Sequence, residues 1–309
     1  MSTVRTVTAT MTPPADRRSA SAPAPTSRTG RRGFSSISPR ELALRYALLV
    51  LVLFLTVGPF LWQLSTSLKG PGEDIHTRTP VFLPQDPTFA NYVTAAETVP
   101  ILGFAGNSLI VAAIAVLGNA VGTTMAGYAL ARLRFRGRNL LMGAMLATML
   151  LPGEATIVAQ YLTIRQIGLA DTLLGVALPG AIGMINVLLM RTAFLAIPRE
   201  LDEAAIVDGA NVWQRFWRIG LPNVKGMLAV ITIFAFIGAW DDFLWPLIVL
   251  TTPDKFTLSV GLQYLSGTFS ANPRVIAAGT MIAFIPIVTF FAVLQRYFFR
   301  GVDEGAIKG

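Results

Sequence analysis

Six long runs of apolar residues, separated by short polar segments, dominate the pattern along this chain of 309 residues. Each run holds about 20 mostly apolar residues, which is the length that an α-helix needs to cross the hydrocarbon core of a bilayer. The sequence therefore predicts an all-α polytopic membrane protein with six transmembrane helices. The expected spans are residues 44–67, 107–131, 139–161, 173–194, 226–250 and 275–299.

Composition divides the chain into four parts. Residues 1–40 are rich in Ser, Thr, Pro, Ala and Arg, and such a segment buries too little apolar surface to offset its ordering entropy, so a disordered cytoplasmic tail is expected. Residues 41–104 hold the first span and an external loop. Residues 105–300 hold the other five spans as a transmembrane core, and residues 301–309 form a short cytoplasmic tail.

Basic residues are distributed unevenly between the two sides of the predicted membrane domain. The chain has 25 Lys and Arg, 17 Asp and Glu, and a net charge of +8. With a cytoplasmic N-terminus, 20 of the 25 basic residues fall on the cytoplasmic side. This asymmetry obeys the positive-inside rule for six spans with both termini in the cytoplasm. The basicity, including the four arginines of the turn 132–138, is therefore interpreted as an orientation signal and not as nucleic-acid binding.

Several kinds of chemistry lack the residues that they need. The chain has no cysteine, and its one histidine, His76, falls alone in the expected external loop. No metal site is expected, and no set of nucleophile, base and metal ligand suggests a membrane-embedded hydrolase. No Gly-Lys dipeptide occurs, so a Walker-type P-loop is absent from the sequence. The energy for any transport must come from another chain or from an ion gradient.

Three acidic residues fall inside the predicted spans: Glu154, Asp241 and Asp242. An ionisable group at membrane depth is costly unless it faces a cavity or a partner, so each acid is a candidate functional residue. Carboxylates accept hydrogen bonds from hydroxyl groups, and the rings of Trp240 and Trp245 can stack on sugar C–H groups. These five residues form the candidate substrate pathway. The other interpretation is that they only cap helix ends near the interface, where tryptophan is common.

Two motifs bear on the packing of the predicted helices. Gly118 and Gly122 form a small-xxx-small pattern, which lets two helices approach closely. Asn186 lies within the apolar run of the fourth span, where an interhelical hydrogen bond is favoured over a contact with a ligand.

A charged island, residues 199–222, interrupts the apolar pattern between the fourth and fifth spans. Pro198 suits the start of a helix, and three acids crowd the first turn, where the helix dipole favours anions. Gly209 can supply a turn with positive φ, Asn211 can cap a second short helix, and Leu221-Pro222 is expected to end it. The prediction is helix, glycine elbow, helix. A DNA-reading helix-turn-helix has a similar outline, but no soluble core surrounds this one.

Three motifs of the island have a characteristic spacing. They are Glu203-Ala204-Ala205, then Gly209, then Ile219-Gly220-Leu221-Pro222. This arrangement resembles the EAA loop of the permeases of ATP-binding-cassette (ABC) importers, which in that family docks into a groove on the ATP-binding subunit. The resemblance implies that the island couples this chain to ATPase subunits. The implied coupling residues are Glu203, Ala204, Ala205, Asp208, Gly209, Leu221 and Pro222.

Five stretches outside the island narrow the resemblance to one subfamily. They are Asn107-Ser108-Leu109, the turn from Tyr128 to Arg138, Leu169-Ala170-Asp171-Thr172, Trp240 to Pro246, and the terminal Gly305-Ala306-Ile307-Lys308-Gly309. Together they resemble the carbohydrate importer permeases, in particular the maltose-type second permease subunit. The similarity runs from about residue 40 to residue 309. It implies a mono-, di- or oligosaccharide, or a glycerol phosphate, as the substrate.

The resemblance also implies a set of partners. They are a second, homologous permease subunit, two ABC ATPase subunits that hold ATP and magnesium, and an extracytoplasmic sugar-binding protein. The chain itself would bind no cofactor and would not be an enzyme. In maltose-type permeases the terminal tail inserts between the ATPase subunits as a thin strand. The implied motor contact here is therefore Gly305, Ala306, Ile307, Lys308 and Gly309.

A gradient-driven secondary transporter is the alternative function. Such a carrier needs intramembrane acids for proton or sodium coupling, and Glu154 with Asp241 could serve. Carriers of that class usually contain inverted repeats, however, and the two halves of this chain show no similarity. Uptake that survives ATP depletion but collapses with an ionophore would favour the alternative.

Overall fold

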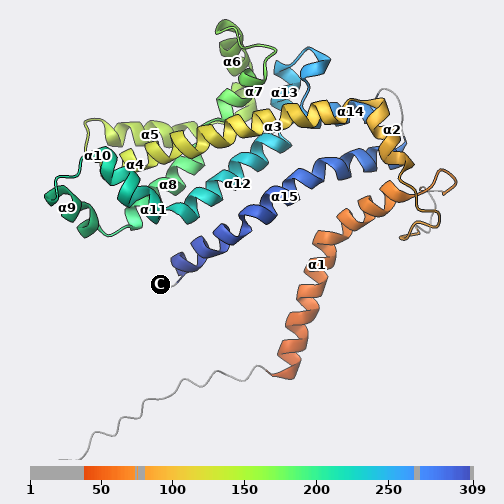
Figure 1. Cartoon of the computed structure of the whole chain (residues 1–309), viewed down its shortest axis with the longest axis horizontal. Helices are drawn as coiled ribbons and strands as arrows, with labels where there is room; N and C mark the ends of the chain where they lie inside the picture. The colour runs from red at the N-terminus through yellow and green to blue at the C-terminus, as the bar shows by residue number, and fades with distance from the viewer. Residues whose placement is uncertain (1–37, 74, 76–80, 268–271, 307–309) are drawn as a thin grey trace, which may run out of the picture. The chain divides into compact units, whose positions relative to one another are not determined.

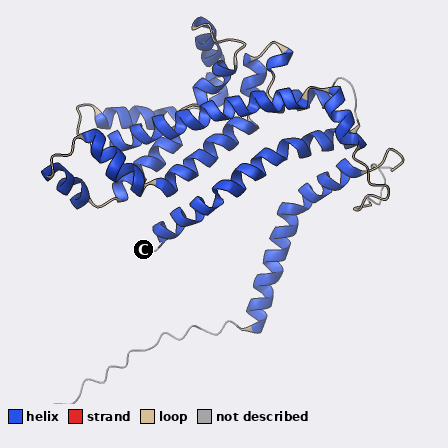
Figure 2. Ribbon diagram, in the orientation of Figure 1, coloured by secondary structure: helices blue, strands red, loops and turns tan. Residues whose placement is uncertain are grey.

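The computed structural model describes residues 38–306 except 74, 76–80 and 268–271. Within these residues every regular element is a helix and no strand occurs (Figure 2). The all-α class predicted from the sequence is therefore confirmed. Most of the predicted N-terminal tail, the lone His76 and the last three residues of the predicted motor contact lie outside the described residues.

The chain divides into two units, one up to Phe54 and one from Leu55 onward, and the boundary falls inside the first helix. The helices, in chain order, are α1 (Pro39–Leu68), α2 (Ala90–Thr98), α3 (Ile101–Gly118), η1 (Asn119–Thr123), α4 (Thr124–Arg132), α5 (Arg138–Thr148), α6 (Gly153–Gln166), α7 (Leu173–Gly180), α8 (Met184–Ala196), α9 (Arg199–Val207), α10 (Val212–Arg215), η2 (Phe216–Gly220), α11 (Leu221–Asn223), α12 (Lys225–Asp241), α13 (Leu244–Val249), η3 (Pro253–Lys255), α14 (Leu258–Gly267) and α15 (Pro273–Ala306).

Three of the described helices are long and apolar enough to cross a membrane by themselves. They are Pro39–Leu68, Ile101–Arg132 and Pro273–Gln295. Three more apolar segments are pairs of helices bent at a short break. They are Arg138–Thr148 with Gly153–Gln166 at 108°, Leu173–Gly180 with Met184–Ala196 at 45°, and Val212–Asn223 with Lys225–Asp241 at 79°. By length and composition the described residues thus hold three spans, or up to six if each bent pair is one span.

Two of the predicted spans are broken beside the intramembrane acids. In the span expected at 139–161, α5 and α6 are separated by residues 149–152, and Pro152 has no N–H to continue a helical hydrogen-bond ladder. In the span expected at 226–250, Asp242 is extended, with a ψ of 123°, and separates α12 from α13. Both expected spans are therefore broken helices, a feature found where backbone lines a cavity or is packed in protein.

The second unit is held together by close helix packing. The helix α12 packs against α3, α8 and α15, and α4 runs along α8 (Figure 1). A Cβ added at Gly118 would lie 2.8 Å from the Cβ of Ala181, and one at Gly127 would lie 2.7 Å from the Cβ of Met190. The close approach predicted at Gly118 is confirmed, and Gly127 extends it along the same continuous helix.

Asp171 clamps the α6–α7 loop to the segment that follows α13. Its carboxylate accepts hydrogen bonds from Lys255 Nζ at 2.8 Å, from Thr252 Oγ1 at 2.7 Å and from the backbone N–H groups of Thr251 and Thr252 at 2.9 and 3.0 Å. These bonds, that from Lys255 above all, hold the pKa of the Asp171 carboxyl well below its usual range. The clamp is therefore present at neutral pH and is lost only as the pH falls through that lowered pKa.

Candidate functional site

The island, residues 199–222, folds as two helices joined by a glycine turn. The first helix, α9, ends at Val207, and Gly209 then adopts a φ of 79° with no described atom within 4 Å of a Cβ added there. Positive φ costs little for glycine and is strained for residues with a Cβ. Asn211 and Gln214 exchange two hydrogen bonds of 2.9 Å as a capping box at the start of the second helix. This local geometry matches the predicted helix, elbow and capped helix.

The second helix of the island ends within one residue of the predicted end. It continues through η2 and α11 to Asn223, so Leu221 and Pro222 belong to its last turn, as expected. Proline is tolerated here because it stands in the first turn of α11, directly after the π-type turn, where its missing N–H breaks no α-helical bond. The direction of the chain changes by 79° between the end of α11 at Asn223 and the start of α12 at Lys225.

Three sets of contacts hold the island together and position it against the helical core. The ring of Tyr128 on α4 meets those of Phe194 on α8 and Phe216 on η2 edge-on, both at 5.2 Å between centroids. Arg215 pairs with Asp202 at 3.2 Å, which joins the two helices of the island. The island is thereby in direct contact with α4 and α8 through Phe216.

The third set comes from Arg132. Its guanidinium donates from Nε and Nη2 to the carbonyl of Phe194, at 3.1 and 2.5 Å, and from Nη2 to the carbonyl of Ile197. The last carbonyls of a helix have no partner within it, and a cation is favoured at that end. Arg132 thus fixes the direction in which the chain leaves α8 and enters the island. The sequence interpretation gave this arginine only an orienting role.

The surface that the island presents to solvent differs in part from the predicted set. Glu203, Ala204, Asp208, Gly209 and Pro222 are exposed, as a contact surface requires. Ala205 is buried and Leu221 is half-buried, so these two support the fold of the island from inside.

Large apolar side chains also belong to the exposed surface of the island, and the sequence interpretation missed them. They include Val207, Trp213 and Trp217, exposed by 87%, 55% and 51%. Trp213 stacks on Phe216 at 5.5 Å, which holds its ring in place. The available signal was a pair of tryptophans, four residues apart, in an otherwise polar island, because exposed aromatics often anchor protein interfaces.

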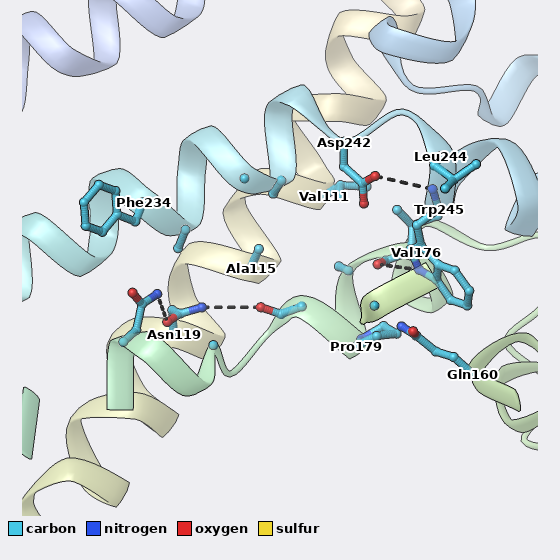
Figure 3. Close-up of a pocket in the computed structure, with 18 of the residues that line it drawn as sticks. Val111, Ala115, Asn119, Gln160, Val176, Pro179, Phe234, Asp242, Leu244 and Trp245 are labelled. Carbon is cyan, nitrogen blue, oxygen red and sulfur yellow. Dashed lines mark hydrogen bonds between the residues drawn. The ribbon is translucent and has the colours of Figure 1, made fainter. Parts of the chain in front are cut away.

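A cavity of about 560 Å³ lies among α3, α6, α7, α8, α12 and α13 (Figure 3). Two acids, Glu154 in the first turn of α6 and Asp242 at the break after α12, line it, and no described basic side chain does. The Asp242 carboxylate accepts the backbone N–H of Trp245 at 3.3 Å. Trp245 donates its indole N–H to the carbonyls of Gly175 and Val176, so only its ring remains for contact with a ligand.

Amide side chains add hydrogen-bonding groups to the same cavity. Asn186 on α8 donates from Nδ2 to Oδ1 of Asn119 at 2.8 Å, and Thr123 Oγ1 donates to the same oxygen at 2.9 Å. The interhelical hydrogen bond predicted for Asn186 is therefore present. Gln160 on α6 also lines the cavity. The cavity thus offers carboxylates, amides and the two aromatic rings of Phe234 and Trp245, a combination suited to a ligand rich in hydroxyl groups.

Trp240 and Asp241 lie apart from this cavity. Trp240 is 3% exposed, stacks on Phe236 and donates its indole N–H to the carbonyl of Ala283 on α15 at 3.1 Å. Both residues line a different cavity, of about 690 Å³, formed by α1, α12, α14 and α15. Successive residues of a helix point about 100° apart, and the break at Asp242 increases the divergence. The predicted substrate pathway is thus divided between two places.

The C-terminal motor contact differs from the expected thin strand. The helix α15 continues to Ala306, so Gly305 and Ala306 are helical. Ile307, Lys308 and Gly309 lie outside the described residues.

Comparison with known proteins identifies the family of the chain. Residues 118–304 match the family described as "Binding-protein-dependent transport system inner membrane component". The chain is 32% identical to the arabinooligosaccharides transport system permease protein AraQ of Halalkalibacterium halodurans, over 84% of this chain and 93% of that protein. It is 34% identical to the diacetylchitobiose uptake system permease protein DasC of Streptomyces coelicolor, over 84% of this chain and 94% of that protein.

A solved structure agrees with these relatives. The crystal structure of a bacterial ABC transporter involved in the import of the acidic polysaccharide alginate matches with a TM-score of 0.73 and 26% identity, over 86% of this chain and 99% of that chain. The predicted identity, a permease subunit of a carbohydrate ABC importer, is confirmed, and with it a multi-pass inner-membrane protein. The chain belongs to the family of binding-protein-dependent transport system inner membrane components.

Proposed function

We propose that this permease subunit couples ATP hydrolysis on partner subunits to the import of a neutral saccharide through the surface of its island. The observation that carries the proposal is the rigid connection of an exposed surface to the helices behind it. Glu203, Asp208 and the two exposed tryptophans form the surface, while Tyr128, Arg132 and the Arg215–Asp202 pair form the connection.

The connection leads from the island to the cavity. The helix α8 begins at Met184, one bend away from α7, and both helices line the cavity of about 560 Å³. A partner that grips the island and moves it would therefore rotate α8 and change access to the cavity as a rigid-body step. The required partners are two ATPase subunits that hold ATP and magnesium, a second homologous permease that completes the pathway, and an extracytoplasmic sugar-binding protein. The family description, which names dependence on a binding protein, supports the last of these.

The orientation that this mechanism needs places the island and both termini in the cytoplasm, with six spans. Because the chain lacks cysteine, single cysteines can be introduced without background. We expect an impermeant maleimide to label Glu97→Cys and Asp254→Cys in intact cells, and to label Arg136→Cys and Asp208→Cys only after permeabilisation. All four positions are exposed, so access to the reagent depends on the side of the membrane. Reversed labelling would contradict the orientation and the contact between the island and the ATPase.

The charge of the cavity supports a neutral substrate. Glu154 and Asp242 line the cavity without a described basic residue, so a uronate would meet repulsion. We expect the complete importer in proteoliposomes to favour a neutral oligosaccharide over its uronic-acid form, after correction for capture by the binding protein. Glu154→Gln should raise relative uptake of the acidic form about fivefold, since one charge contributes about 1 kcal/mol in a hydrated site.

Glu97→Gln is the matched control for the substrate experiment, because Glu97 is exposed on α2 and lines neither of the cavities discussed above. It should leave the uptake ratio unchanged. An unchanged ratio in Glu154→Gln, with ATP-dependent uptake intact, would refute the role of the cavity in selectivity but leave the coupling proposal standing. Loss of ATP dependence in the parental complex would instead refute ATP-driven import.

A further inference from the structure

An arginine-rich feature lies where the first residue of the island meets the turn after α4, and its arginines form none of the contacts that connect the island to α4 and α8. It is a cavity of about 490 Å³ between the turn after α4, the start of α5 and the start of α9. Arg134, Arg138 and Arg199 line it, with Asn139 as a further polar group, and no described carboxylate does. Asp202 and Glu203 line the neighbouring cavity of about 480 Å³ with the same arginines. In the cavity of about 490 Å³ the three like charges repel one another, and a bound anion would relieve that repulsion.

The guanidinium groups of this cavity are available to a ligand. Arg134 and Arg199 are exposed, and the side chain of neither forms a hydrogen bond or ion pair with any described residue. Arg138 donates one long hydrogen bond, at 3.5 Å, to the carbonyl of Leu133. The nearby Arg132 and Arg215 differ, because the first binds carbonyls and the second pairs with an acid.

The edge of the cavity is apolar on the side of α5. Phe135 and Leu140 line it and are 42% and 79% exposed. Exposed apolar side chains next to exposed arginines are typical of the membrane interface, where the cationic heads reach the lipid headgroups. The turn joins the second and third expected spans, which also places the cavity at a bilayer surface. A free phosphate would use the arginines alone, whereas a phospholipid uses both features.

We propose that this cavity binds the phosphodiester of an anionic phospholipid, with the three guanidinium groups around the phosphate oxygens and the acyl chains on Phe135 and Leu140. Planar guanidinium groups match phosphate geometry, and basic pockets on the cytoplasmic side of membrane proteins bind anionic headgroups. Arg199 is the first residue of α9, so an occupied site would join the headgroup layer to the island.

The test measures the binding of phosphatidylglycerol to the purified importer complex by native mass spectrometry, with phosphatidylcholine of the same acyl chains as reference. Each interfacial arginine contributes about 1 kcal/mol, or about a fivefold change in affinity. We therefore expect Arg134→Gln/Arg199→Gln to weaken phosphatidylglycerol binding by about 25-fold. The control, Arg136→Gln/Arg218→Gln, removes the same charge at two exposed arginines that do not line the cavity, and should change the affinity little.

Four outcomes would overturn the proposal. Equal weakening in the control variant would indicate non-specific attraction to charge. Equal affinity of the parental complex for phosphatidylcholine would remove the role of the anion. Full displacement of the lipid by millimolar glycerol phosphate would assign the cavity to a free phosphate ester. Loss of the ATPase subunits from the Arg134→Gln/Arg199→Gln complex, with phosphatidylglycerol affinity unchanged, would assign the arginines to a protein contact.

Discussion

Gly209→Val is expected to abolish most sugar uptake while the protein still inserts into the membrane and assembles. The φ of Gly209 is 79°, and a β-branched residue held there costs about 1–3 kcal/mol. A cost of that size shifts the equilibrium constant between the native elbow and other conformations by about 5–150-fold. The two helices of the island then lose their relative orientation, so ATPase activity should no longer depend on the sugar-binding protein. Uptake and ATPase assays on the reconstituted complex measure both effects.

Two comparisons separate coupling from general strain at the elbow. Gly168→Val introduces the same strain at a φ of 76°, also without a described atom within 4 Å, in a loop remote from the island along the chain. It should leave binding-protein control of ATP hydrolysis intact. Gly209→Asn should keep most of the uptake, because asparagine tolerates positive φ. Parental uptake by Gly209→Val would show that the elbow does not transmit force.

Gly127→Val is expected to destabilise the fold itself. A Cβ at this position would lie 2.7 Å from the Cβ of Met190 and 3.0 Å from the backbone nitrogen of Arg191, and backbone atoms of a packed helix cannot turn away. Overpacking of this kind costs about 1–3 kcal/mol or more. The distance between α4 and α8 would increase, and Tyr128 would pack less tightly against Phe194. The expected result is a lower yield of folded protein and a Tm reduced by several degrees in detergent.

The control for this substitution is Gly143→Val on α5, where a Cβ would meet no described atom within 4 Å. It carries the same small gain in helix propensity, because valine ranks above glycine, without the clash between helices. Equal Tm values for the two variants would contradict the conclusion that close packing at Gly127 supports the fold.

The sequence predicted more of the island than of the cavity, because the structure of the island depends on residues that are close together in the chain. The positive φ of Gly209 and the capping box of Asn211 depend on side chains within a few residues of each other, so the pattern of residues is sufficient to predict them. The end of the second helix was predicted to within one residue, but the π-type turn before Pro222 was not foreseen. The capping of α8 by Arg132 joins residues more than sixty positions apart, and no local pattern indicates it.

The apolar runs by themselves indicated a helical membrane protein. The resemblance of the island and of five stretches outside it to known permeases then indicated a carbohydrate ABC importer. Only the tertiary structure decided which intramembrane residues share a cavity. Adjacent positions on one helix point in different directions, and the break at Asp242 turned that residue toward Glu154 and Trp245 while Trp240 packed against α15. The composition of a span sets the cost of burying an acid, but helix rotation and helix breaks decide what that acid faces.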